Sequence, residues 1–177
     1  MAVRIGRIHG VGIAMMSVQQ AFERLWPEAL CTNLLDGSLS PDRESDEVPT
    51  DSMCERIRIL VDYVTGTGVA GILVTCSAFG EAIGAAAATA PIPVLKPNEA
   101  MFEAAIDSGT RIGMPATFAP AVASTEREFA VMAAQRQSPA RMETYCVPEA
   151  MAALRAGDGD IHNRLLADAP CVCETMT

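Results

Sequence analysis

Gly71-Ile72-Leu73-Val74-Thr75-Cys76-Ser77-Ala78-Phe79-Gly80 is the stretch that decides the fold class of this chain. It begins as a short apolar run, which is typical of a buried strand in a parallel sheet. Cys76 then lies at the carboxyl end of that strand, where open α/β sheets place their active sites. The backbone N–H groups of Ser77, Ala78 and Phe79 open the next helix, and we expect them to favour a thiolate and lower the pKa of Cys76. An ordinary buried cysteine is the alternative, because cysteine is among the most buried residue types.

Composition places the chain among globular proteins. Its 177 residues are 50% hydrophobic and 20% charged, so it can bury a substantial core. The net charge of -9 argues against nucleic acid or an anionic membrane surface as a partner. The amino-terminal segment has no continuous apolar region, and no uncharged run reaches membrane-spanning length. We therefore expect a cytoplasmic protein whose six cysteines are thiols rather than disulfides.

Strand-like and helix-like segments alternate along the first half. The pattern predicts strands at 4–9, 30–35, 71–76 and 91–95, and helices at 17–26, 52–65, 81–88 and 97–106. The apolar face of the first helix is expected to carry Val18, Ala21, Phe22 and Leu25. Ser52 and Glu55 have the spacing of a capping box, and the polar segment 36–50 predicts a loop. This order implies a parallel, helix-covered sheet with right-handed crossovers.

The second half echoes the first. Arg111-Ile112-Gly113 repeats Arg4-Ile5-Gly6, and both copies precede a small-residue loop and an amphipathic helix. A strand at 142–147 and helices at 149–155 and 160–169 follow. We predict an α/β protein with two pseudo-symmetric parallel-sheet halves, a first domain at 1–96 and a second at 97–177. Strand-loop-helix units look alike in general, which is the alternative explanation of the echo.

The spacing of the echo predicts that the second half is incomplete. Gly6 and Cys76 are 70 positions apart, and Gly113 plus 70 gives 183, beyond residue 177. Either the second half is compressed and Cys171 or Cys173 supplies its cysteine, or the chain is truncated or altered there. The polar tail that follows Pro170 favours the second explanation.

Three segments of the chain carry a resemblance to a known family. They are Leu73-Val-Thr-Cys-Ser-Ala-Phe-Gly80, Pro93-Val-Leu-Lys-Pro-Asn-Glu-Ala-Met101 and Arg111-Ile-Gly-Met-Pro-Ala-Thr-Phe118. They resemble the aspartate/glutamate racemase superfamily, which includes hydantoin racemases and arylmalonate decarboxylases, over roughly residues 4–168. In that superfamily two similar α/β domains face each other across a cleft, and each contributes a cysteine.

The resemblance implies a set of site residues. Cys76 matches the first-domain cysteine, and Cys173 is the candidate for the second catalytic thiol. The expected substrate-binding residues are His9, Gly10, Thr75, Ser77, Ala78, Phe79, Ala116 and Thr117. Aspartate racemases read Cys-Asn-Thr where this chain has Cys76-Ser77-Ala78, and a second strand ending in Gly-Cys-Thr is not visible.

The implied function is a cofactor-independent racemase or isomerase of a small amino acid, hydantoin or related carboxylate. One thiolate would remove the proton next to the carboxylate, and an opposing thiol would return it to the other face. No metal or organic cofactor is expected, and the protein is expected to form a homo-oligomer. A single-cysteine decarboxylase of a malonate-type acid and an inactive small-acid-binding homologue are the alternatives.

Overall fold

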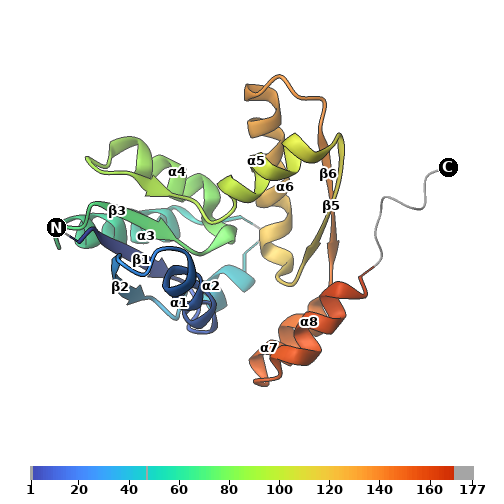
Figure 1. The fold of residues 1–177 in the computed structure, drawn as a ribbon, viewed down its shortest axis with the longest axis horizontal. Coiled ribbons are helices and arrows are strands. Elements are labelled where there is room, and N and C mark those ends of the chain that lie inside the picture. Colours follow the sequence, from blue (N-terminus) through green and yellow to red (C-terminus); the bar gives the residue numbers. More distant parts are fainter. Residues whose placement is uncertain (1, 47, 170–177) are drawn as a thin grey trace. The chain divides into compact units, whose positions relative to one another are not determined.

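The computed structural model describes residues 2–46 and 48–169. The chain divides into two compact units, Met1–Pro97 and Asn98–Thr177. Each unit has helices and a sheet of parallel strands, as the ribbon in Figure 1 shows. The predicted α/β class with parallel sheets is therefore confirmed.

The first unit is built on a four-stranded sheet in the order β2-β1-β3-β4. The central strand β1 (Arg4–His9) pairs with β2 (Leu30–Leu35) and with β3 (Gly71–Val74), and β4 (Val94–Leu95) pairs with β3. All three pairings are parallel, so every strand ends at the same edge of the sheet. The register aligns Ile8 with Val74, which brings the residues that follow β1 and β3 together.

Helices α1 (Ile13–Leu25), α3 (Asp51–Thr65) and α4 (Gly80–Thr89) connect these strands. The buried residues of α3 recur at helical spacing: Met53, Ile57, Val61 and Val64. The predicted capping box at Ser52 is wrong, because Thr50 is the N-cap and its hydroxyl accepts a hydrogen bond from Met53 N–H at 3.3 Å. Thr50 has the extended backbone of a cap (φ -75°, ψ 161°), whereas Ser52 already lies inside the helix.

Helix α1 differs from the expected helix at both ends. It begins at Ile13, four positions before Ser17, and it ends at Leu25. The side chain of Leu25 is 73% exposed, so its predicted place on the apolar face is wrong. Trp26, just beyond the helix, stacks on Phe22 instead, with 6.4 Å between the ring centroids.

Segment 36–50 is not the loop that its composition predicts. It contains α2 (Leu39–Glu44), in which Leu39 is completely buried. Arg56 of α3 holds the segment by ion pairs to Asp36 at 2.6 Å and to Asp42 at 2.5 Å. One buried leucine and a doubly paired arginine thus order a stretch whose local composition is typical of loops.

The second unit contains a two-stranded sheet among its described residues. Strands β5 (Arg111–Ala116) and β6 (Arg141–Cys146) are parallel and aligned from Arg111 with Arg141 to Ala116 with Cys146. The helices of this unit are α5 (Glu99–Ser108), α6 (Ala119–Gln135), α7 (Pro148–Arg155) and α8 (Gly159–Ala167). The unit β5-α6-β6 repeats the order and parallel pairing of β1-α1-β2.

Two phenylalanines form the centre of the core in the second unit. Phe102 of α5 and Phe129 of α6 meet edge to face, with centroids 5.5 Å apart and planes at 89°. Ile106, Ala133 and Ala140 complete the buried cluster, and Ile112 of β5 packs against it. Phe129 therefore lies on the buried face of α6.

Candidate active site

Cys76 lies just beyond the carboxyl end of β3, as the sequence predicted. Thr75 N–H donates to the carbonyl of Ile8 at 2.9 Å and so fixes this segment to the end of β1. Ser77–Phe79 form a single turn of 3₁₀-helix before α4 begins. Ala78 and Phe79 are buried, so their side chains belong to the core and only their backbone groups could contact a ligand.

Gly10 packs closely against the thiol of Cys76. A Cβ atom at Gly10 would lie 2.9 Å from Cys76 Sγ and 3.4 Å from Cys76 Cβ. The same position would be 3.6 Å from Cβ of Leu39 in α2. The loop after β1, the loop after β3 and helix α2 therefore converge on Cys76, and glycine leaves the room that the thiol occupies.

The protonation state of Cys76 is opposite to the expectation from its sequence context. Burial raises the pKa of Cys76 to about 11, whereas the Ala78 N–H hydrogen bond and the charge of Arg43 act in the lowering direction. Phe79 N–H donates to the Cys76 carbonyl oxygen at 3.3 Å, which removes one of the three donors expected to stabilise a thiolate. The predicted lowering of the pKa is therefore wrong, because desolvation outweighs the short helical turn.

Arg43 is a site residue that the sequence analysis missed. Its side chain is only 2% exposed, and its Nε donates to the Ala78 carbonyl at 3.5 Å. Nη1 donates to the carbonyl of Asp46. The spacing of Leu39 and Arg43, one helical turn apart, is the signal in the sequence that could have indicated an ordered helix here.

His9 is completely buried at the end of β1. Its Nε2 donates to Oδ1 of Asn33 at 3.0 Å, and its Nδ1 lies 2.9 Å from the hydroxyl of Thr75. Burial lowers the pKa of His9, the Asn33 hydrogen bond opposes this, and the charge of Arg7 adds to the lowering. In the neutral ring Nδ1 accepts a hydrogen bond from the Thr75 hydroxyl, so His9 helps to fix the residue that precedes Cys76.

In the second unit, Ala116 ends β5 and Thr117 follows it. The Ala116 carbonyl accepts a hydrogen bond from Val147 N–H at 2.7 Å, and Cys146 is aligned with Ala116 at the end of β6. Burial raises the pKa of the Cys146 thiol, and the charge of Glu149 raises it further. Cys173, the expected second thiol, lies outside the described residues.

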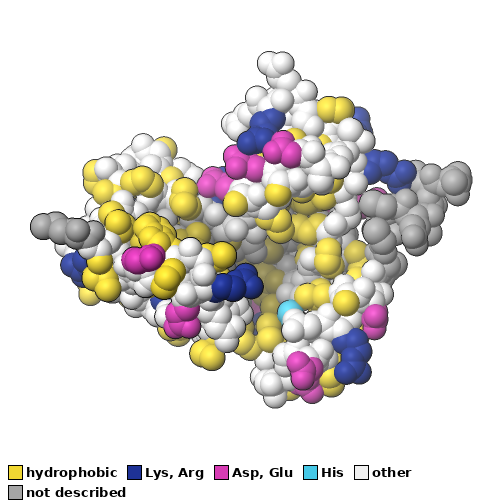
Figure 2. All heavy atoms as spheres, viewed as in Figure 1, with side chains coloured by type: hydrophobic (Ala, Val, Ile, Leu, Met, Phe, Trp, Pro, Cys, Tyr) yellow, Lys and Arg dark blue, Asp and Glu magenta, His cyan; other side chains and the backbone are white. Residues whose placement is uncertain are grey.

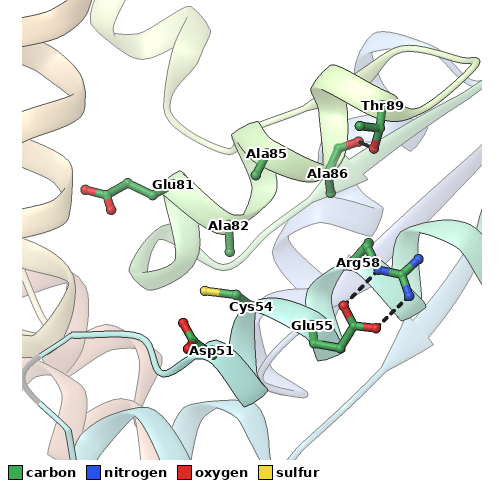
Figure 3. Close-up of a pocket in the computed structure, with 9 residues that line it drawn as sticks. All are labelled: Asp51, Cys54, Glu55, Arg58, Glu81, Ala82, Ala85, Ala86 and Thr89. Carbon is green, nitrogen blue, oxygen red and sulfur yellow. Dashed lines mark hydrogen bonds and ion pairs between the residues drawn. The ribbon is translucent and has the colours of Figure 1, made fainter.

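A hollow of the first unit lies between α3 and α4, and Cys76 is not among the residues that line it. It has a volume of about 410 Å³, and Figure 3 shows the Cys54 thiol directed into it. Its walls include Ala82 and Ala85, and Asp51 and Glu81 contribute charge. Burial and then the charges of Asp51 and Glu81 raise the pKa of Cys54, so this thiol is a poor nucleophile.

The described residues contain no group of three or more side chains that could bind a metal ion. The four described cysteines, at positions 31, 54, 76 and 146, are free thiols. Acidic and basic side chains are interspersed on the face of the described residues shown in Figure 2. No described helix is long and apolar enough to span a membrane.

The sequence matches no protein-family model and no curated protein. Solved structures do match. The glutamate racemase of Aquifex pyrophilus is 16% identical with a TM-score of 0.63, over 81% of this chain and 55% of that one. The aspartate racemase of Picrophilus torridus is 14% identical with a TM-score of 0.68, over 93% of this chain and 73% of that one. The glutamate racemase of Campylobacter jejuni subsp. jejuni is 17% identical with a TM-score of 0.69, over 99% of this chain and 68% of that one.

These similarities lie at the level of the fold. The chain spans 55% of the length of the Aquifex enzyme and about 70% of the other two. They confirm the expected resemblance to glutamate and aspartate racemases, whereas the relation to arylmalonate decarboxylases stays a prediction. The chain has the α/β fold of the glutamate and aspartate racemases.

Proposed function

We propose that the protein is a cofactor-independent racemase or isomerase that moves a proton at the carbon next to a carboxylate, with Cys76 as acid and base. The observation that carries the proposal is the position of the Cys76 thiol. It is held at the carboxyl edge of the sheet against Gly10 and receives a hydrogen bond from Ala78 N–H. The fold shared with racemases supports the same assignment.

The charges around Cys76 favour a small carboxylic acid as the substrate class. The neutral thiol and the neutral His9 ring leave Arg43 as the cation that acts on Cys76. A positive potential beside a buried thiol attracts an anion and stabilises the negative charge that develops when the carbon is deprotonated. Thr75 and Ser77, on either side of Cys76, are the proposed hydroxyl contacts. Ala116 and Thr117 are also proposed as substrate-binding residues.

A racemase also needs a second acid–base group on the opposite face of the substrate. Cys173 is the residue assigned to this role from the sequence. Cys146 is the described thiol at the carboxyl edge of the second sheet, and it is the competing candidate. Serine variants of each, assayed singly, distinguish the two, because only the true partner of Cys76 is required for inversion.

Hydrogen exchange at the α-carbon tests the proposal. The wild-type protein is incubated in deuterium oxide with single enantiomers of aspartate, glutamate and a set of hydantoins, and loss of the α-proton is followed by NMR. We expect exchange with inversion in the wild type and its loss in Cys76→Ser. Cys54→Ser is the matched control, because that thiol is directed into the α3–α4 hollow and should be dispensable. Exchange that persists in Cys76→Ser would exclude Cys76 as the acid–base group.

One observation favours a decarboxylase as the second candidate. With its pKa raised by burial to about 11, Cys76 is a proton donor at neutral pH. A decarboxylase of a malonate-type acid needs one proton donor and no thiolate at rest. Carbon dioxide release from substituted malonates, lost in Cys76→Ser, would support this function. Binding of small acids without exchange or carbon dioxide release would indicate an inactive homologue.

A further inference from the structure

Arg7 is a buried cation that contacts no carboxylate among the described residues. It lies in the middle of β1, and its side chain is 1% exposed. Its Nη2 donates to the amide oxygen of Gln19 in α1, and its Cζ lies 5.2 Å from the centroid of the Phe22 ring. Nε and Nη1 are buried without a hydrogen-bond partner among the described residues.

The groups around Arg7 are neutral. The side-chain amide of Gln19 donates a hydrogen bond to the Glu23 carboxylate at 2.7 Å. Gln19 therefore lies between that carboxylate and the guanidinium of Arg7. His9 lies two residues along β1 and therefore on the same face of the sheet. It is neutral, and the charge of Arg7 contributes to keeping it so. The layer between β1 and α1 thus carries one positive charge that its own side chains do not balance.

An ionised group buried without a counter-charge is strongly unfavourable, and unpaired buried N–H groups add to this. Many side chains escape by changing their protonation state, but a guanidinium stays charged. The Phe22 ring compensates the charge only partly, because a cation–π contact is weaker than an ion pair in a desolvated site. A small anion bound to Nε and Nη1 would supply the remaining compensation.

We propose that Arg7 anchors an internal binding site for a small inorganic anion between β1 and α1, with Nε and Nη1 as its donors. The almost complete burial of the guanidinium favours a small halide over an organic phosphate. The site is independent of the reaction proposed for Cys76. Because an anion there binds only the folded protein, it stabilises the fold by mass action.

Chloride is the probe, and sodium gluconate at the same ionic strength is the reference salt. We expect the wild type to broaden the chloride NMR line and to unfold at a temperature that rises by several degrees, about 2–5 °C, with chloride but not with gluconate. Arg7→Met should lose both effects. Arg58→Met is the matched control, because Arg58 is an exposed arginine on α3 and its loss should leave both effects intact.

A second variant retains Arg7, and so avoids the loss of a core side chain. Gln19→Glu combined with Glu23→Gln exchanges the amide and the carboxylate along one turn of α1 without changing the net charge. The carboxylate at position 19 then pairs directly with Nη2 of Arg7. We expect this variant to lose the chloride response and to unfold at a higher temperature than the wild type in gluconate. The proposal is overturned if the wild type shows no chloride-specific effect, or if either Arg7→Met or the exchanged pair responds like the wild type.

Discussion

Substitution of Gly10 by alanine should displace the Cys76 thiol. The new Cβ would lie 2.9 Å from Sγ, whereas non-bonded heavy atoms rest about 3.5–4.0 Å apart. The thiol therefore has to move by roughly 0.6 Å or more, and rotation about its single side-chain torsion is the cheapest route. Among the described residues, positive φ angles occur at Gln137, Gly68 and Gly157, so the change at Gly10 introduces a steric clash rather than backbone strain.

The size of the effect follows from the pKa of the thiol. Burial holds the pKa of Cys76 at about 11, against 9.0 for an ordinary cysteine. A thiol that leaves its buried position regains up to about 100-fold in thiolate fraction at neutral pH. Alkylation of Cys76 by iodoacetamide should therefore accelerate by as much as that factor in Gly10→Ala. The proposed α-proton exchange should fall about 100-fold, because a displacement near 1 Å costs a catalytic group about that much.

Peptide mass spectrometry measures the alkylation of Cys76 separately from the other cysteines, across a range of pH. Gly12→Ala is the matched control, because a Cβ there meets only Leu35 Cδ2 at an ordinary 3.8 Å. We expect the control to alkylate like the wild type and Gly10→Ala to show a faster rate with a lower pH midpoint. Equal rates and equal midpoints in Gly10→Ala and the wild type would refute the assigned packing of Gly10 on the thiol.

Three further predictions test other parts of the structure. Burial lowers the pKa of His9 in the folded protein. The contribution of neutral His9 to the free energy of unfolding is therefore complete above the unperturbed pKa of 6.5 and is lost as the pH falls towards the lowered pKa. Urea unfolding at about pH 7 and about pH 5 should thus show a larger loss of stability in the wild type than in His9→Gln. Leu39→Ala should lower the free energy of unfolding by about 2–5 kcal/mol, an effect absent if α2 were a solvated loop. Phe129→Leu should cost about 1–2 kcal/mol by removing the edge-to-face contact with Phe102, measurable as a lower unfolding temperature.

The strands were predictable because their signal is local. Arg4–His9 and Leu30–Leu35 have the bounds that the apolar pattern predicted, and Cys76 follows its strand as expected. Turns and helix ends flank these strands, so the sequence fixes the bounds of each strand to within a few residues. The order of these elements then leaves few ways to arrange them, which is why the parallel α/β class could be inferred from the sequence.

The α2 segment was not predictable, because distant residues order it. Arg56 lies in the next helix, yet its two ion pairs hold Asp36 and Asp42. Leu39 is buried against the loop after β1, where a Cβ at Gly10 would approach it. A local pattern of serine, proline and acidic residues cannot reveal such contacts, so Arg43 was missed with the helix that carries it.

Burial determines the protonation states of the side chains at this edge of the sheet, and burial depends on the tertiary structure. The strand ends in the sequence placed Cys76 and His9 at the same edge of the sheet. Desolvation then moves the pKa of the thiol up and that of the imidazole down, so both groups rest in their neutral forms. The backbone donors after Cys76, taken alone, predict the opposite direction for the pKa of the thiol. A neutral thiol can give a proton before it can take one, so the direction of the first proton transfer depends on burial that the local sequence does not encode.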